Sequence, residues 1–451
     1  MKRFAWAQDV LFKRVLRNSG FLFGSNILGA LLSIVTANLL GVASFGALEV
    51  VTRLVSNINR LLSFRMSEVV VKHMGESLAQ DNPARAAAVV KAAALVEGGT
   101  SLLAYLALAA VTPWAARNLA HDPSLAPLFL LYGLSILGNL TTETATGVLQ
   151  VGNHYGSQAT INLVQSVLVA VLLGVAAITH ANLWAVTLIY LLGKLILGLA
   201  PIAVALYWLP RMLGRGWWKA PFSLLPPWRQ LGLFAINTNF SGTVNVLARD
   251  SEGLWISYFF STVEAGYFKV ALSLINLIVM PVTPFIATTF PEITRTIALK
   301  QWQRLRDLLR RVTALAAGWT GVVTLGLLAL GRPLLFSNWS LFGRTFHVYR
   351  PEYAPAYPAL LILLVGYGIA NIFFWNRTLL LGFGEAAYPL KVGLASAAAK
   401  TVLTVVLVPV YGYLMEALLL TLYFAAWVGF TVQRGLRELR RQEQGAVENP
   451  A

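Results

Sequence analysis

The sequence predicts an all-α, polytopic membrane protein with twelve transmembrane helices in two six-helix lobes. Of its 451 residues, 57% are hydrophobic and 12% are charged, and the mean hydropathy is +0.66, which excludes an ordinary soluble protein. Apolar stretches of about 20 residues recur along the whole chain, each long enough to cross a hydrocarbon core of roughly 30 Å as a helix. These stretches are continuously apolar, which excludes a membrane β-barrel, whose strands alternate with period two.

Twelve such stretches can be delimited in the sequence. The first is too long for the core of a signal peptide and lacks a small-residue cleavage site, so we expect it to remain as helix 1. In chain order, the predicted helices cover residues 18–40, 45–72, 87–112, 124–149, 158–180, 183–208, 231–260, 265–290, 308–337, 355–381, 388–410 and 413–433.

The two halves of the chain are predicted to be copies of one another. Residues 39–60 align without a gap on 259–280, and residues 128–152 align on 360–384. Two matches in the same order indicate a duplication. Six crossings in each copy give both the same orientation, related by a pseudo-two-fold axis along the membrane normal. The predicted domains are an N-terminal lobe (1–208), a cytoplasmic linker (209–230), a C-terminal lobe (231–433) and a cytoplasmic polar tail (434–451).

The net charge of +16 is concentrated on one side of the predicted topology. With the N-terminus inside, 22 of the 35 Lys and Arg residues fall on inner segments. The outer segments hold only Arg117, Arg332, Arg344 and Arg350. This asymmetry predicts a multi-pass protein of the inner (cytoplasmic) membrane with both termini in the cytoplasm. Anionic lipid explains the basic loops, so we expect no nucleic-acid partner.

The sequence contains none of the usual signatures of an enzyme. It has no cysteine, and its five histidines have no metal-ligand spacing. No Walker A sequence, GxSxG elbow or HExxH motif is present. We therefore expect no catalytic residue, no metal and no cofactor.

A polar seam runs along predicted helix 2. At about 100° per residue, Glu49, Arg53, Ser56 and Arg60 fall on one face of this helix. The aligned face of predicted helix 8 begins with Lys269. Both copies thus have a cation at the start of a polar seam.

Nine cations lie inside predicted spans. Exposed to lipid, each would cost about 2.5–3.5 kcal/mol, or about 20–30 kcal/mol together, whereas whole-protein stability is only about 5–15 kcal/mol. Most must therefore face water, one another or a carboxylate, and a hydrated cavity between the lobes would satisfy this. Pairing stays open for each: Glu49 and Arg53 are four residues apart, and Arg249 could pair with Asp250 or Glu252. The predicted substrate-binding residues are Arg53, Arg60, Arg249, Lys269, Arg377, Lys400, Lys194, Asn57 and Asn276.

A cationic cavity open to the membrane plane fits an anionic headgroup attached to a lipid tail. Arginine offers a bidentate fork for phosphate, and lysine offers a movable point charge. A hydrophobic organic cation would prefer a more acidic cavity.

Four stretches of the sequence together form a recognisable set. They are LLGVASFGALEVV (39–51), FFSTVEAGYFKVALSLINLIVMPVTPFIATTFPEI (259–293), PEYAPAYPALLILLVGYG (351–368) and VPVYGYLMEALLLTLYF (408–424). As a set they resemble the polysaccharide-exporter (O-antigen type) flippases of the multidrug/oligosaccharidyl-lipid/polysaccharide (MOP) superfamily. The likeness spans nearly the whole chain, although Met415 and Glu416 interrupt the small-residue pattern that is usual after the proline-tyrosine-glycine turn.

The resemblance implies two six-helix lobes in a V shape that rock by alternating access and flip a polyprenyl-pyrophosphate-linked oligosaccharide outward, for cell-surface polysaccharide assembly. It places a cationic cavity on helices 2, 7 and 8, which carry Arg53, Arg60, Arg249 and Lys269. The expected partners are the lipid-linked oligosaccharide and membrane lipid, and the protein is expected to be a monomer.

The source of energy and three other functions stay open. Without a nucleotide site, a proton or sodium gradient must be considered, with Glu49, Asp250 and Glu252 as the ion-coupling candidates. A cation-coupled antiporter of organic cations would share the architecture but would need a cavity acid. A lipid II flippase of the same superfamily would need two additional helices. A membrane-embedded glycan polymerase would need a large extracytoplasmic loop, and the outer segment 333–357 is short.

Overall fold

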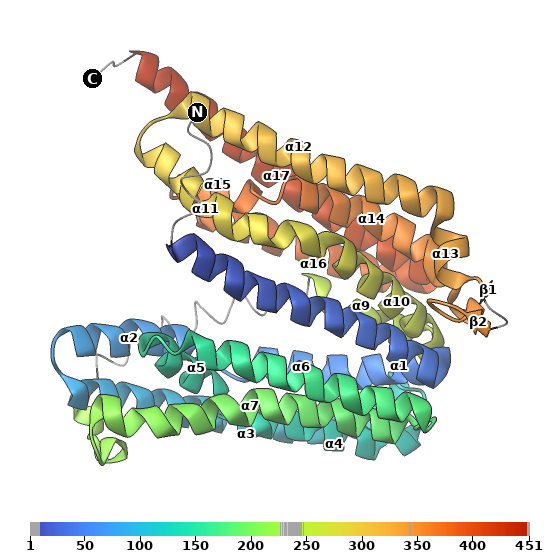
Figure 1. The fold of residues 1–451 in the computed structure, drawn as a ribbon, viewed down its shortest axis with the longest axis horizontal. Helices are drawn as coiled ribbons and strands as arrows, with labels where there is room; N and C mark the ends of the chain where they lie inside the picture. The colour runs from blue at the N-terminus through green and yellow to red at the C-terminus, as the bar shows by residue number, and fades with distance from the viewer. Residues whose placement is uncertain are drawn as a thin grey trace. The chain divides into compact units, whose positions relative to one another are not determined.

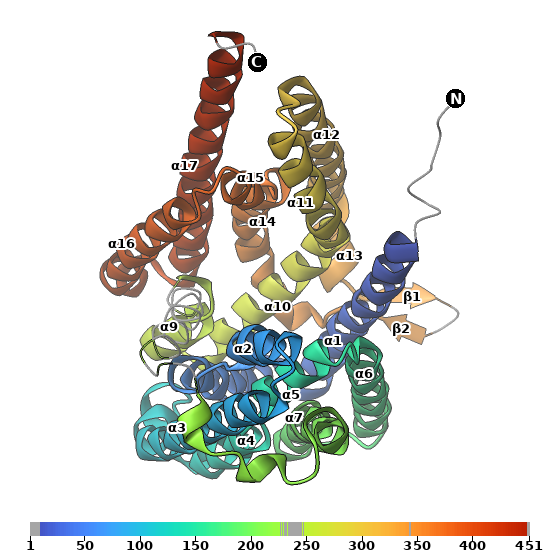
Figure 2. The same ribbon diagram turned by 90° about the vertical axis from the view of Figure 1, so that its left-hand side faces the viewer.

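The computed structural model describes residues 10–225, 227, 229, 232, 246, 248–341 and 344–448, and most of them are helical. The chain forms two compact units, Met1–Val246 and Leu247–Ala451. Figures 1 and 2 show the elements of each unit as ribbons. The predicted all-α class is confirmed. Most of predicted helix 7 (231–260) lies outside the described residues.

The first unit begins with a long bent helix, α1 (Val10–Leu62). The bend is at Gly41, where φ is +73°, a conformation that glycine adopts readily because it has no Cβ. It separates predicted helix 1 from predicted helix 2. The helices that follow are α2 (Ser67–Ala79), α3 (Pro83–Asn118), α4 (Ala126–Gly138), α5 (Thr142–Val151), α6 (Tyr155–Ile178) and α7 (Leu183–Leu213).

The second unit contains the later helices and one small hairpin. A π-helical turn, Leu327–Gly331, follows α12, and strands β1 and β2 pair antiparallel with Trp339 opposite Phe346. The elements in order are α9 (Glu252–Phe259), α10 (Thr262–Val279), α11 (Thr283–Ala298), α12 (Trp302–Gly326), α13 (Arg332–Phe336), β1 (Trp339–Leu341), β2 (Arg344–Phe346), α14 (Ala356–Ile372), α15 (Asn376–Gly382), α16 (Ala387–Tyr411) and α17 (Tyr413–Glu448).

Ten helical stretches among the described residues are long and apolar enough to cross a membrane. One of them, Leu28–Ala79, contains predicted helices 1 and 2 on either side of the Gly41 bend. The ten stretches therefore account for eleven of the twelve predicted helices, and the twelfth is predicted helix 7.

Among the described residues, three helices that the sequence predicts as continuous are divided by three or more non-helical residues. Predicted helix 2 is interrupted at residues 63–66, predicted helix 4 at 139–141 and predicted helix 10 at 373–375. The prediction of unbroken spans is wrong at these three places because hydropathy reports only that a segment is apolar. A break inside a membrane protein depends on partners elsewhere in the fold that satisfy the freed backbone groups.

Breaks recur at aligned positions of the two copies. Gly41 bends α1, and the residue aligned with it in the second copy, Ser261, is the N-cap of α10. When the second alignment is extended, His180 falls opposite Gly412. Both have positive φ, His180 between α6 and α7 and Gly412 between α16 and α17. Equivalent breaks at aligned positions support the duplication.

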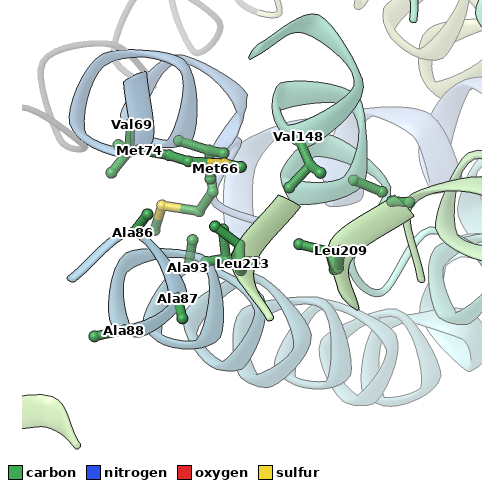
Figure 3. Packing of buried hydrophobic residues seen from close by; sticks show 14 of the residues in the cluster. Met66, Val69, Met74, Ala86, Ala87, Ala88, Ala93, Val148, Leu209 and Leu213 are labelled. Carbon is green, nitrogen blue, oxygen red and sulfur yellow. The ribbon is translucent and has the colours of Figure 1, made fainter. Parts of the chain in front are cut away.

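Close helix packing in the first unit depends on small residues (Figure 3). Met74 of α2 and Ala93 of α3 share an apolar cluster with Leu209 of α7. A Cβ on Gly147 of α5 would lie 2.8 Å from the carbonyl oxygen of Ser67, so α2 and α5 are in near backbone contact. Small residues at such interfaces allow membrane helices to approach closely.

Candidate functional site

The predicted polar seam of the first unit lies on α1 after the bend. Glu49 is 5% exposed, and Arg53 donates from Nε to Glu49 Oε1 at 2.8 Å. Asn57, one turn further along, is also buried. The pairing that the sequence left open for Arg53 is therefore present, and it neutralises a buried carboxylate one helical turn away.

Arg60 and Lys194 bring two charges of like sign together. Arg60 is exposed in the last turn of α1. Lys194 lies within α7, where part of the residue is accessible but surrounding protein atoms desolvate its charge. Lys194 lies within electrostatic reach of Arg60. No ion pair of Lys194 with a carboxylate is seen in the described part of the chain. Two neighbouring cations of this kind repel each other and attract an anion placed between them.

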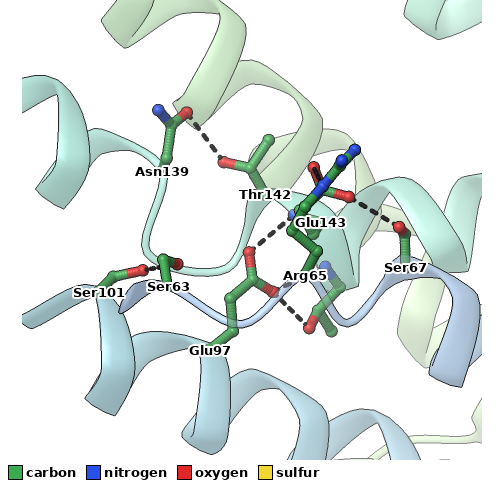
Figure 4. A network of polar contacts seen from close by, with 9 residues as sticks. Ser63, Arg65, Ser67, Glu97, Ser101, Asn139, Thr142 and Glu143 are labelled. Carbon is green, nitrogen blue, oxygen red and sulfur yellow. Dashed lines mark hydrogen bonds and ion pairs between the residues drawn. The ribbon is translucent and has the colours of Figure 1, made fainter. Parts of the chain in front are cut away.

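A carboxylate holds the break between α4 and α5 (Figure 4). Glu97, in the middle of α3 and 1% exposed, accepts the backbone N–H groups of Glu143 and Thr144, each at 2.8 Å, and the Thr144 hydroxyl at 2.7 Å. The first turn of a helix has N–H groups without helical partners and favours negative charge. Glu143 in turn accepts hydrogen bonds from Arg65 and Ser67. These acids stabilise the divided helix.

Three charged side chains meet in the interior of the second unit. Lys400 Nζ on α16 lies 2.7 Å from Glu252 Oε1 on α9 and 2.7 Å from Glu416 Oε1 on α17. Their side chains are 3%, 2% and 0% exposed, respectively. Thr404 donates to Glu416 Oε2 at 2.8 Å. We call Lys400, Glu252 and Glu416 the buried charge cluster.

The remaining predicted residues of the second unit are more accessible. Asp250 and Lys269 are half-buried, and Arg249 is exposed but lies within electrostatic reach of Tyr423, as do Lys400 and Glu252. Asn276 and Arg377 are exposed, on α10 and in the first turn of α15.

Sequence reasoning missed the two acids that have the most extensive buried contacts, Glu97 and Glu416. The only sequence signal for either residue is that it is an acid within an apolar span, which marks it as a candidate functional residue. Glu252 was matched with Arg249 as a possible pair, whereas the structure pairs it with Lys400.

Comparison with known proteins shows similarity over most of the chain. Residues 15–297 match a family model described as polysaccharide biosynthesis protein. A segment of 154 residues is 25% identical to inner membrane protein YghQ of Escherichia coli (strain K12), covering 33% of this chain and 43% of that protein. The match thus spans less than half the length of this relative.

Several solved structures share the fold, among them the following two. One is an inward-facing multidrug resistance MATE family transporter of the MOP superfamily, with a TM-score of 0.69 and 12% identity over 93% of this chain and 96% of that chain. The other is the lipid II flippase MurJ in an inward closed conformation, with a TM-score of 0.69 and 14% identity over 96% of this chain and 91% of that chain. The predicted two-lobed, twelve-helix fold is confirmed by this likeness.

Proposed function

Because this chain belongs to the polysaccharide biosynthesis protein family, we propose that it is a flippase that moves a polyprenyl-pyrophosphate-linked oligosaccharide across the membrane. It is a multi-pass membrane protein with the fold of MOP superfamily transporters. We propose transport from the cytoplasmic to the outer leaflet by alternating access, with both termini in the cytoplasm and with Arg60 and Lys194 as substrate contacts. Arg53 and Lys400, which the sequence also predicted to contact the substrate, are instead paired with carboxylates of the protein.

The observation that carries the proposal is the proximity of Arg60 and Lys194. The two cations come from different helices and lie within electrostatic reach of each other. A pyrophosphate carries its negative charge on two adjacent phosphoryl groups. It could accept a bidentate guanidinium at one phosphate and an ammonium at the other.

The buried acids argue against the rival function, an antiporter of organic cations. Such a transporter would need an available carboxylate as its substrate partner. Glu49 is paired with Arg53, Glu97 holds the start of α5, and Glu252 and Glu416 share Lys400. These four acids are already engaged by partners in the protein, which favours an anionic substrate.

The test is reconstitution of the full-length protein with a fluorescent polyprenyl-pyrophosphate oligosaccharide. Because two charge contacts are lost, we expect Arg60→Gln with Lys194→Gln to lower the initial flipping rate at least about tenfold. Lys391→Gln is the matched control, because it removes an exposed lysine from another predicted span. We expect this control to retain the wild-type rate.

Three outcomes would contradict the proposal. Equal rates in the double variant and the control would remove these cations from the transport path. A covalently altered glycan would indicate an enzyme such as a polymerase. Efflux of an organic cation without flipping of the oligosaccharide would favour the antiporter. The folded yield of each variant is measured beside its rate, so that loss of protein is distinguished from loss of transport.

We propose that the buried charge cluster couples transport to protons. With Lys400 charged and both carboxylates ionised, the cluster would carry a net charge of −1 in a region closed to solvent. Such a charge is costly to bury, and one shared proton would remove it. Thr404 donates to Glu416, and Tyr423 lies within electrostatic reach of Lys400, Glu252 and Arg249. Glu49 and Asp250 are the alternative ion-coupling candidates.

Imposed gradients test the coupling. In proteoliposomes we expect a pH gradient to stimulate wild-type flipping and a sodium gradient to have no effect. Glu416→Gln should abolish the stimulation while exchange without a gradient continues. The exposed Glu352 supplies the control variant, Glu352→Gln. Stimulation by sodium, or an unchanged pH response in Glu416→Gln, would contradict proton coupling at this cluster.

A further inference from the structure

A groove in the second unit combines arginines with an apolar floor. Its volume is about 530 Å³, and it lies between the first turns of α12 and the last turns of α17, with Trp375 of the α14–α15 break at its base. Figure 2 shows α15 between α11 and α17. The lining residues are Arg306, Leu309, Arg310, Thr313, Ala314, Trp375, Leu436, Leu439 and Arg440. We call this the α12–α17 groove.

The groove carries a surplus of positive charge. Arg306 is neutralised by Glu443, whose carboxylate lies 2.5 Å from its guanidinium. Arg310 and Arg440 are exposed and have no ion pair in the part of the chain that the structure describes, although Asp307 lies nearby on α12. Two guanidinium groups on facing helices therefore remain available to an anion.

The floor of the groove is apolar and has one hydroxyl group. Leu309, Leu439 and Trp375 are 4%, 3% and 3% exposed. Thr313 accepts the indole N–H of Trp375 at 2.7 Å, which leaves the hydroxyl proton of Thr313 available to a further acceptor. The groove thus combines two cations and a hydroxyl donor with buried hydrocarbon.

The position of the groove indicates an amphiphilic ligand. The charged start of α12 changes within a turn to a helix with large exposed apolar side chains, Leu315, Val322 and Leu325, at 64%, 69% and 68% exposure. Such side chains face acyl chains in a membrane helix, so Arg310 lies at the level where headgroups meet the hydrocarbon. Basic pockets between membrane helices at this level bind anionic headgroups.

We propose that the α12–α17 groove binds the phosphate headgroup of an anionic membrane phospholipid, separately from the transported substrate. Arg310 and Arg440 form ion pairs with the phosphate, and the Thr313 hydroxyl donates a hydrogen bond to it. The acyl chains lie along the exposed apolar side of α12. The cations proposed for the transported pyrophosphate, Arg60 and Lys194, belong to the first unit. Binding to the groove therefore goes beyond the proposed function and can be measured without transport.

The experiment is native mass spectrometry of the delipidated full-length protein, titrated with dioleoyl phosphatidylglycerol or dioleoyl phosphatidylcholine in detergent. We expect one phosphatidylglycerol to bind more tightly than phosphatidylcholine. Because each arginine near the membrane surface strengthens anionic lipid binding by about fivefold, Arg310→Gln with Arg440→Gln should weaken this site roughly thirtyfold. The matched control is Arg311→Gln with Arg437→Gln, which removes two exposed arginines from the same helices outside the groove.

The outcomes distinguish specific lipid binding in the groove from non-specific electrostatic attraction to the protein surface. Equal loss of binding in both double variants, or equal binding of the two lipids by the wild type, would overturn the proposal. Displacement of phosphatidylglycerol by millimolar inorganic phosphate would show that the groove takes a free anion, which would overturn the assignment to a lipid. Preserved flipping in Arg310→Gln with Arg440→Gln is expected, so this site can fail without affecting the proposed function.

Discussion

Gly198 of α7 lies so close to Gly138 of α4 that a Cβ on Gly198 would come 2.4 Å from the carbonyl oxygen of Gly138. Gly138 is the last residue of α4, at the edge of the break that precedes α5. The Thr142 hydroxyl donates to the Gly198 carbonyl at 3.1 Å across the same contact. The divided helix is therefore held by close backbone packing as well as by the Glu97 carboxylate.

Gly198→Ala should separate these helices. The atom that the new methyl group would meet is backbone, which cannot turn aside, so we expect a loss of about 1–3 kcal/mol of stability. Gly174→Ala on α6 is the control, because a Cβ there meets nothing within 4 Å. Thermal unfolding in detergent should show a lower Tm for the first variant only. Equal Tm values in both would contradict the close contact.

Removing Lys400 should destabilise the second unit more than removing an exposed lysine from the same helix. Lys400→Met leaves two carboxylates in a region without solvent, and the loss of one partner of a buried ion pair costs about 3–5 kcal/mol. Lys391→Met supplies the control. Combining Lys400→Met with Glu252→Gln and Glu416→Gln removes the charges together and should restore much of the Tm. No recovery in the triple variant would show that packing, and not charge, causes the loss.

Glu97→Ala should loosen the start of α5. It leaves the N–H groups of Glu143 and Thr144 and one hydroxyl without their acceptor, at a cost of about 1–3 kcal/mol. Hydrogen exchange should become faster in the first turn of α5, while α6 keeps its protection. Glu68→Ala, at an exposed acid in the first turn of α2, is the control. Unchanged exchange in α5 would contradict the role of this carboxylate.

The ion pair between Glu385 and Arg434 should make the stability of the protein fall at acidic pH. Arg434 donates two hydrogen bonds to Glu385, at 2.8 and 2.6 Å, and these lower the pKa of the Glu385 carboxyl below its ordinary value. Because the folded pKa is the lower one, this stabilisation is complete above the unfolded pKa of about 4.3 and is lost as pH falls through the folded pKa. The difference in Tm between wild type and Glu385→Gln should therefore be constant from pH 7 to pH 5 and should shrink below about pH 4. A difference that grows on acidification would refute the pair.

The apolar stretches of the sequence were sufficient to predict the membrane class and the helix order. Hydropathy depends on the local run of side chains, so eleven predicted spans correspond to helices in the described residues. The repeat alignment also paired Gly41 with Ser261, two positions at which helices break. The breaks within predicted helices 2, 4 and 10 could not be predicted, because each depends on contacts with other helices. Gly138 and Gly198 lie on different helices, and nothing local to either residue reports their contact.

For the charged residues too, the sequence determines some properties and the tertiary structure determines others. The sequence by itself determined that many cations and few acids lie within the spans, since this follows from composition and position. Only the tertiary structure decided which of them meet. It pairs Lys400 of α16 with Glu252 of α9 and Glu416 of α17, and it places Arg60 near Lys194. Electrostatic interactions depend on distance in space. Helix packing brings together side chains that are far apart in the sequence, so their positions in the sequence do not reveal which of them interact.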